Sequence, residues 1–144
     1  MGYCSQADLV LEIGTTALTE LTDDAGEGEV NADIVTFVIA NADAVIDGYL
    51  GMVYTLPLTA TPTLIRKISL DLSVYDLYSR KTSGEIPPIR AERRAEAVAL
   101  LEKIGAGTIS FPATQATELS GDDTLDSTTD IDDRIVTMTI LENL

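Results

Sequence analysis

The longest regular pattern of apolar positions begins near Asn31. Apolar side chains recur there at spacings of three, four and seven residues: Ile34, Val35, Val38, Ile39, Ala42, Val45, Ile46, Tyr49, Leu50 and Val53. This spacing gathers them on one broad stripe of an α-helix, so we predict a long helix over residues 31–53. Asp43 and Asp47 fall outside the stripe, and we expect them on a solvated or partner-facing edge of the helix.

Prolines interrupt the pattern directly after this helix. Pro57 and Pro62 each bias the residue before them toward extended geometry, which predicts a stiff, non-helical linker over residues 54–62. Apolar positions in the next segment, 63–81, wrap most of the way round a helix, as expected of a helix buried by several neighbours. Asp76 and Arg80 stand four residues apart there, so we expect them to pair on its surface.

Two further helices are predicted, one on each side of these central segments. Ser5, followed three residues later by Asp8, is typical of a helix start and predicts a short helix that ends at Gly14. Residues 15–30 then form a turn-rich, acidic segment. A last helix is predicted over residues 89–104. Its inward residues are Ala95, Val98, Leu101 and Ile104, and its outward residues are Arg90, Arg93, Arg94 and Lys103.

The composition changes after Phe111. Residues 113–134 are rich in acidic side chains and poor in large apolar ones, which predicts a flexible, solvated segment. Residues 135–144 are apolar or β-branched on both faces and predict a strand or arm, paired with residues 108–111 or with another molecule. The expected fold is therefore mainly α: a four-helix-type bundle over residues 1–112, with a short β element and an extended C-terminal arm.

Composition narrows the cellular setting. The 144-residue chain suits one domain, and its single cysteine, Cys4, cannot form an internal disulfide, which favours a reducing compartment. The first ten residues lack the basic and apolar regions of a signal peptide, and we find no apolar run long enough to span a membrane. These features predict a soluble, intracellular protein without membrane contact.

Charge is unevenly distributed along the chain, whose formal net charge is −15. Residues 1–65 hold ten acidic residues and no Lys or Arg, whereas residues 66–103 hold eight basic and six acidic residues. A protein with this negative charge is repelled by the phosphate backbone of DNA, so we do not expect it to bind DNA by electrostatic attraction. We expect the acidic N-terminal part to meet the basic helices of a neighbouring copy.

Catalytic chemistry finds little support in the sequence. Without any histidine, the usual Ser/His/Asp and Cys/His arrangements are excluded within the chain. No nucleotide-binding glycine loop is present, and the acidic runs do not match a calcium-binding loop. A metal-dependent enzyme that uses Asp43 and Asp47, or Asp122 and Asp123, is a minor alternative. We predict no enzymatic activity, no cofactor and no metal.

Several short stretches together resemble a known family. They are "LTDD", "ADAVIDGYL", "YTLPL", "TPTL", "LDLSVYDLYSRK" and "AVALLEKIGAGTISF". With this spacing the chain, over residues 3–111, resembles head-completion proteins of Mu-like phages and prophages, which act as neck or head–tail connector proteins. It departs from the family at Val53, where members often have an arginine, and the acidic segment 113–134 has no counterpart in the pattern.

The resemblance implies a structural virion protein, made in the host cytoplasm and assembled as a ring beneath the portal. DNA would pass through the ring without specific binding, and the partners would be sibling copies, portal and tail-completion proteins. The residues that we predict at partner interfaces are Tyr49, Tyr54, Pro57, Arg90, Arg93, Arg94, Ile135 and Met138. An acidic module that mimics DNA and occupies a basic protein is the alternative function.

Overall fold

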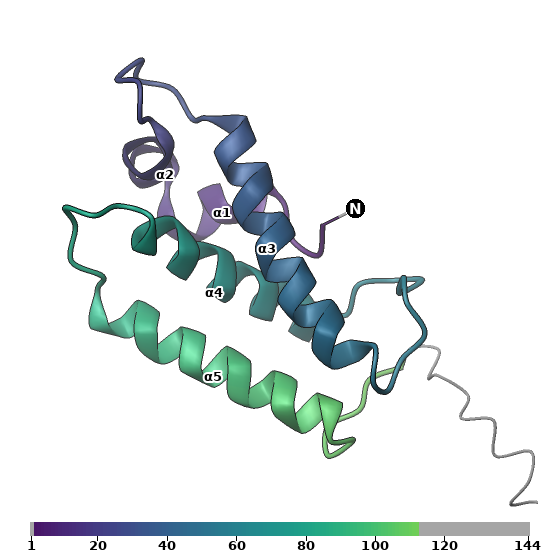
Figure 1. Ribbon diagram of the computed structural model, residues 1–144. Helices are drawn as coiled ribbons and strands as arrows, with labels where there is room; N and C mark the ends of the chain where they lie inside the picture. The colour runs from purple at the N-terminus through teal and green to yellow at the C-terminus, as the bar shows by residue number, and fades with distance from the viewer. Residues whose placement is uncertain (1, 113–144) are drawn as a thin grey trace, which may run out of the picture.

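Five helices make up the described part of the protein. The computed structural model describes residues 2–112 and contains α1 (Gln6–Ile13), α2 (Thr15–Thr22), α3 (Ala32–Leu50), α4 (Thr63–Ser79) and α5 (Pro88–Gly105) (Figure 1). Within residues 2–112 there is no strand, so the mainly α prediction is confirmed. The predicted acidic segment 113–134 and C-terminal arm 135–144 lie outside the described residues.

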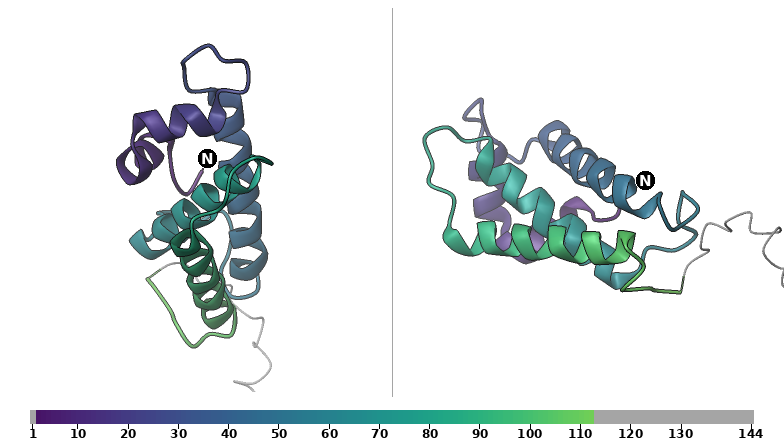
Figure 2. Two further views of the ribbon diagram at one scale, coloured as in Figure 1. Left: turned by 90° about the vertical axis from the view of Figure 1, so that its left-hand side faces the viewer. Right: turned by 60° about the horizontal axis from the view of Figure 1, so that its bottom comes forward.

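Helices α3, α4 and α5 pack against one another, and α1 and α2 lie near the end of the bundle where α3 begins (Figures 1 and 2). Two apolar clusters follow from this arrangement. The first joins α3, α4, α5 and the α3–α4 linker through Ala42, Ile46, Leu50, Tyr54, Ile65, Ile68, Leu72, Ala97, Leu101 and Ile104. The second joins α1 and α2 to α3 and α4 through Cys4, Leu9, Leu18, Leu21, Val35, Val38, Ile39, Val74 and Leu77.

The N-terminal helix begins and ends where the sequence predicts. The Ser5 side chain accepts a hydrogen bond from the Asp8 backbone N–H while the Asp8 carboxylate accepts one from the Ser5 N–H, which forms a capping box. Gly14, with φ 82°, ends α1 in a backbone conformation that favours glycine.

Helix α2 was not predicted, because its residues were assigned to a turn-rich segment. It follows Gly14 at once and has no side-chain cap at its N-terminus, so the usual start signal is missing. Leu18 and Leu21 are buried against α3 and α4, and this tertiary packing stabilises a helix that has few sequence signals of its own. The turn-rich prediction holds for the loop that follows α2.

Helix α3 begins as predicted, with the Asn31 side chain accepting hydrogen bonds from two backbone N–H groups of the first turn. It ends at Leu50, and Val53 lies in the linker that leads to Thr63. The predicted apolar stripe was too broad, because Val45 is exposed on the outer side of the helix.

Three details of α4, α5 and the segment after α5 differ from the predictions. Asp76 and Arg80 do not pair, because Arg80 reaches across to the α2–α3 loop. On α5 the inward alanine is Ala97, whereas Ala95 is exposed. Residues 108–111 form no strand; instead Phe111 stacks on Tyr54, with ring centroids 4.3 Å apart.

Candidate interaction surfaces

Ion pairs join the acidic N-terminal helix to the basic helices of the same chain. Asp8 of α1 pairs with Arg66 of α4 at 2.5 Å. Glu12, one turn further along α1, accepts hydrogen bonds from Arg90 of α5 at 2.8 Å and from Arg93. The arginines hold the pKa of each carboxyl below its ordinary value. Helix α1 is therefore attached to α4 by charge and by apolar packing, and to α5 by charge.

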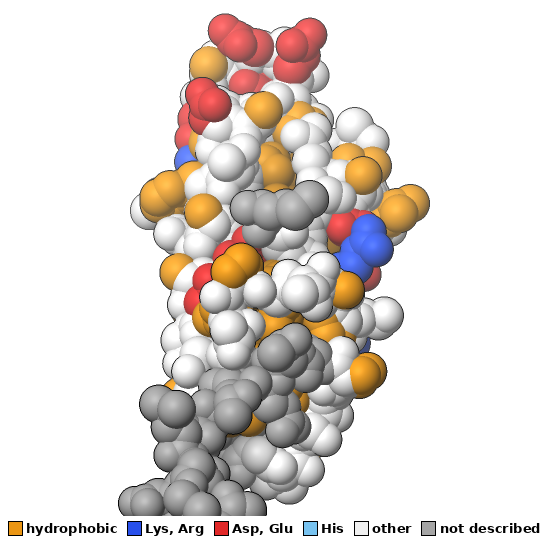
Figure 3. All heavy atoms as spheres, turned by 90° about the vertical axis from the view of Figure 1, so that its right-hand side faces the viewer, with side chains coloured by type: hydrophobic (Ala, Val, Ile, Leu, Met, Phe, Trp, Pro, Cys, Tyr) orange, Lys and Arg blue, Asp and Glu red, His pale blue; other side chains and the backbone are white. Residues whose placement is uncertain are grey.

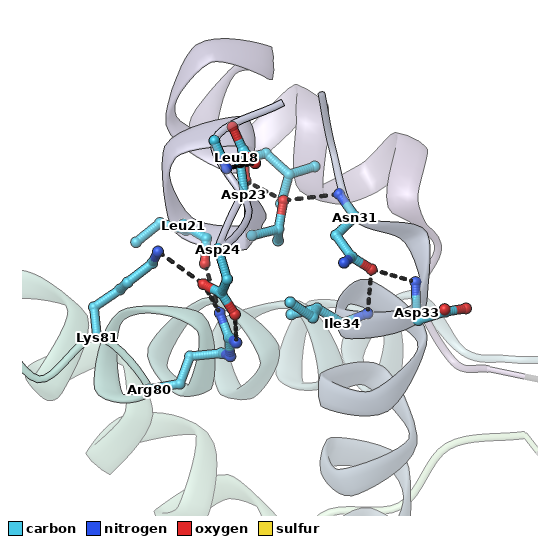
Figure 4. A network of polar contacts seen from close by, with 11 residues as sticks. Leu18, Leu21, Asp23, Asp24, Asn31, Asp33, Ile34, Arg80 and Lys81 are labelled. Carbon is cyan, nitrogen blue, oxygen red and sulfur yellow. Dashed lines mark hydrogen bonds and ion pairs between the residues drawn. The ribbon is translucent and has the colours of Figure 1, made fainter. Parts of the chain in front are cut away.

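A second set of ion pairs attaches the α2–α3 loop to the end of α4 (Figure 4). Asp24 pairs with Arg80 at 2.5 Å and with Lys81 at 2.9 Å. The other guanidinium nitrogen of Arg80 donates to the Leu21 carbonyl at 2.8 Å, at the end of α2. Hydrogen bonds from Arg80 and Lys81 lower the pKa of Asp24 to about 2.

These pairs change the interpretation of the charge pattern. The acidic front of the chain meets basic helices within its own fold, so the charge segregation does not by itself require a neighbouring copy. Of the three arginines predicted at a partner interface, Arg90 and Arg93 bind Glu12, and Arg94 lies 4.8 Å from the centre of the Tyr75 ring. Each therefore has a structural role inside the chain.

We expect the protein to lose stability in acid through these carboxylates. A carboxyl whose pKa is lowered in the folded state stabilises the fold above its unfolded pKa of about 3.9 and loses that effect as the pH falls through the folded value. For Asp24, with a folded pKa of about 2, the loss falls between about pH 4 and pH 2. Carboxyl ¹³C chemical shifts measured by NMR should give a midpoint for Asp24 well below 3.8, and Arg80→Gln should raise it. A midpoint near 3.8 in the unsubstituted protein would contradict the pairing.

The loop between α2 and α3 forms an acidic end of the molecule, where red side chains gather in Figure 3. Asp23 folds the loop around itself, because its carboxylate accepts hydrogen bonds from the backbone N–H groups of Gly26, Glu27 and Gly28 at 2.7–2.9 Å. Gly26 and Gly28 both have positive φ, which glycine adopts without strain. The Asp23 carboxylate therefore fixes the conformation of the loop.

The segment before α1 is held against α3 and α4. The Asp43 carboxylate accepts hydrogen bonds from the Tyr3 backbone N–H, at 3.2 and 3.3 Å, and from the Ser69 hydroxyl at 3.0 Å, while the Tyr3 hydroxyl donates to Asp47. Burial raises the pKa of Asp43. We expected Asp43 on a solvated or partner-facing edge; it is instead half-buried, and its carboxylate holds the N-terminal segment in place. Asp47 is exposed but is used by the same segment.

Cys4 lies in the core beside this contact. Its thiol is within hydrogen-bonding reach of the Ser69 hydroxyl at 3.2 Å and of the Ser73 hydroxyl at 3.8 Å. Burial raises the pKa of the thiol, which keeps it in the unreactive, protonated form.

In residues 2–112 no group of three His, Cys, Asp or Glu side chains could hold a metal ion, and Asp122 and Asp123 lie outside those residues.

The remaining predicted interface residues fall in different environments. Tyr54 is only 2% exposed and its hydroxyl accepts a hydrogen bond from the Phe111 N–H at 3.2 Å, so it belongs to the core. Tyr49 is half-buried against Gly105 of α5. Pro57 is exposed and lines a hollow between the linker and the N-terminal segment. Ile135 and Met138 lie outside the described residues.

Sequence reasoning missed the large apolar side chains that the fold leaves exposed. They are Leu11 at 85%, Met52 at 68%, Phe37 at 63%, Ile89 at 50% and Val45 at 45%. Phe37 was outside the predicted stripe of α3, and an aromatic residue on the polar side of an amphipathic helix was the available signal. No helix of residues 2–112 combines the length and the apolar character needed to cross a membrane.

Fold and surfaces together define an acidic, mainly helical protein in which most Lys and Arg side chains of residues 2–112 contact groups of the same chain and five large apolar side chains are exposed. The chain belongs to the Bacteriophage Mu, Gp36 family, whose model matches residues 3–136. It is therefore a phage-related protein. The match extends past residue 111 and includes the acidic segment, which the sequence resemblance had left out. No match was found among curated proteins.

Proposed function

We propose that this chain is a structural virion protein of the phage head–tail joint, a ring-forming adaptor beneath the portal. The observation that carries the proposal is the family match over residues 3–136. The exposed apolar side chains of Leu11 and Phe37 support it, because a protein that works within an assembly needs such contacts. With a net charge of −15 on each copy, the ring would repel the DNA that passes through it, so that the DNA does not adhere.

In this proposal the protein carries out no reaction and needs no cofactor. The chain has no histidine, and the carboxylates of Asp8, Glu12 and Asp24 are occupied by arginine or lysine side chains of the same chain. The same pairs weaken the case for a DNA mimic. A mimic presents its carboxylates to a basic partner, whereas these three are paired within the fold, which leaves the acidic end with the exposed Glu27, Glu29 and Asp33 as the surface that a mimic could use.

Assembly of the full-length protein tests the proposal. Native mass spectrometry at rising protein concentration, alone and with the portal and tail-completion proteins of the same phage, should show closed oligomers or oligomers bound to the portal. An unrelated acidic protein of similar charge serves as the control for non-specific binding. A protein that stays monomeric at high concentration and binds neither partner would overturn the proposal, and capture of a basic nuclease or repressor instead would favour the DNA mimic.

A further inference from the structure

The outer face of α3 is uncharged and open. Phe37 and Val45 are exposed on it, and Asn41, Ala44 and Gly48 lie between or beside them at spacings of three and four residues. These five positions carry no charge and extend over about 16 Å of helix at 1.5 Å per residue. A side-chain carbon added at Gly48 would meet nothing within 4 Å and the other four positions are exposed, so no other described part of the chain covers this face.

A second open surface is the groove between α1 and α4. Its apolar lining comes from the exposed Leu11 of α1 and the half-buried Leu70 of α4, and its lining residues are Asp8, Leu11, Glu12, Thr63, Arg66, Lys67 and Leu70. Arg66 and Lys67 keep 57% and 56% of their side chains exposed, although each is paired with a carboxylate. The exposed charge at the α1–α4 groove is therefore mainly basic, because the carboxylates of Asp8 and Glu12, which also line it, are only 11% and 26% exposed.

The two surfaces point away from each other. Leu9 of α1 and Val38 of α3 are buried in the same apolar cluster, which fixes the inner sides of both helices. Leu11 follows Leu9 by two residues and lies on the opposite side of α1, while Phe37 lies on the outer side of α3. In Figure 1, α3 lies in front and α1 lies behind it.

Charge on the two surfaces is complementary. Helix α3 carries three acidic residues and no basic residue, and two of them, Asp33 and Asp47, are exposed beside its outer face. The rim of the α1–α4 groove presents Arg66 and Lys67. An uncharged strip with acidic edges thus matches a groove with an apolar lining and exposed basic side chains, and such a match favours one orientation of two copies over others.

We infer that the outer face of α3 in one copy binds the α1–α4 groove of the next copy. This inference rests on the proposed ring and identifies its subunit contact. Because the two surfaces differ and lie on opposite sides of the chain, each copy uses one surface toward each neighbour. Repetition of such a heterologous contact closes a ring when the rotation between copies permits it.

Single substitutions on each surface test the contact in the full-length protein. Phe37→Asp and Leu11→Asp should each weaken self-association by about 30-fold or more, the effect of losing an interface hot spot. Both side chains are exposed, so circular dichroism and urea unfolding should show an intact fold. Ala99→Asp is the matched control, since Ala99 is exposed on α5 and belongs to neither surface. This variant should assemble normally.

Mixing the two variants gives the sharpest result. Phe37→Asp keeps an intact groove and Leu11→Asp keeps an intact α3 face, so the mixture should form a one-to-one dimer and nothing larger. If α3 instead bound α3 of another copy, Leu11→Asp would dimerise alone and the inference would be wrong. The inference would also be wrong if Met138→Asp abolished assembly and the mixture gave no dimer, because the C-terminal residues would then be the occupant.

The remaining outcomes separate this inference from the proposed function. If the unsubstituted protein assembles and both variants assemble equally well, the contact proposed here is wrong and the ring adaptor stands. If the unsubstituted protein remains monomeric alone and with the portal, both are overturned.

Discussion

Replacing Tyr54 with alanine is expected to lower the free energy of unfolding by about 3–5 kcal/mol, the usual cost of truncating a buried aromatic side chain. Tyr54 is 2% exposed, packs in the cluster that joins the linker to α3, α4 and α5, and stacks on Phe111. Its loss would leave a cavity and release the segment that follows α5. Urea unfolding followed by circular dichroism measures the change.

Tyr54→Phe is the matched control for this substitution. It keeps the ring and the stacking on Phe111 but removes the acceptor of the Phe111 N–H, so it should cost about 1 kcal/mol. Equal and small losses for the two variants would show that the ring is not part of the core.

The second large effect is expected at Ile46 on α3. Ile46 is fully buried, and Ile46→Ala should lower the free energy of unfolding by about 2–5 kcal/mol through lost burial and a residual cavity. Its neighbour Val45 is 45% exposed, so Val45→Ala should change the stability by no more than about 0.5 kcal/mol.

Both variants are best unfolded in urea at low micromolar concentration, where contacts between copies contribute least. The two substitutions are adjacent in sequence and differ mainly in the side of α3 on which they lie. A loss for Val45→Ala as large as that for Ile46→Ala would mean that the outer face of α3 is covered within a single chain. That result would also remove the basis for an α3 contact between copies.

Local signals explain which parts of the fold were predictable. The capping box of Ser5 and Asp8, the cap at Asn31 and the two prolines of the linker each act on their own backbone neighbours. A few adjacent residues therefore suffice to recognise them. The helices that begin or end at these signals have the predicted boundaries to within a few residues.

Features that depend on distant parts of the chain were not predictable. The spacing of Asp76 and Arg80 suggested a pair on one helix, but the Asp24 carboxylate and the Leu21 carbonyl lie within reach of Arg80 once the α2–α3 loop is in place. Likewise Asp43 is held by Tyr3 and Ser69, which lie 40 and 26 residues away in the sequence. Nothing near Asp43 in the sequence indicates either partner.

The candidate functional residues were likewise only partly predictable from the sequence. The family was recognised from short motifs, whereas most of the residues chosen for partner contacts proved to be used within the chain or lie outside the described residues. Tyr54 is the clearest case. Its position beside a proline-rich turn suggested an exposed contact residue, but its side chain is buried under the segment that follows α5. Burial of this tyrosine depends on how the linker closes over the helices, and no short sequence pattern near Tyr54 indicates that closure.

The ion pairs of the N-terminal part also bear on how the protein is made. Asp8, Glu12 and Asp24 find their cationic partners 56 to 81 residues further along the chain. While the ribosome is still synthesising residues 1–65, the emerging polypeptide carries ten negative charges with no Lys or Arg to neutralise them. None of these three ion pairs can form until the basic residues of α4 and α5 have been translated, so α1 and the α2–α3 loop are fixed by charge only late in synthesis.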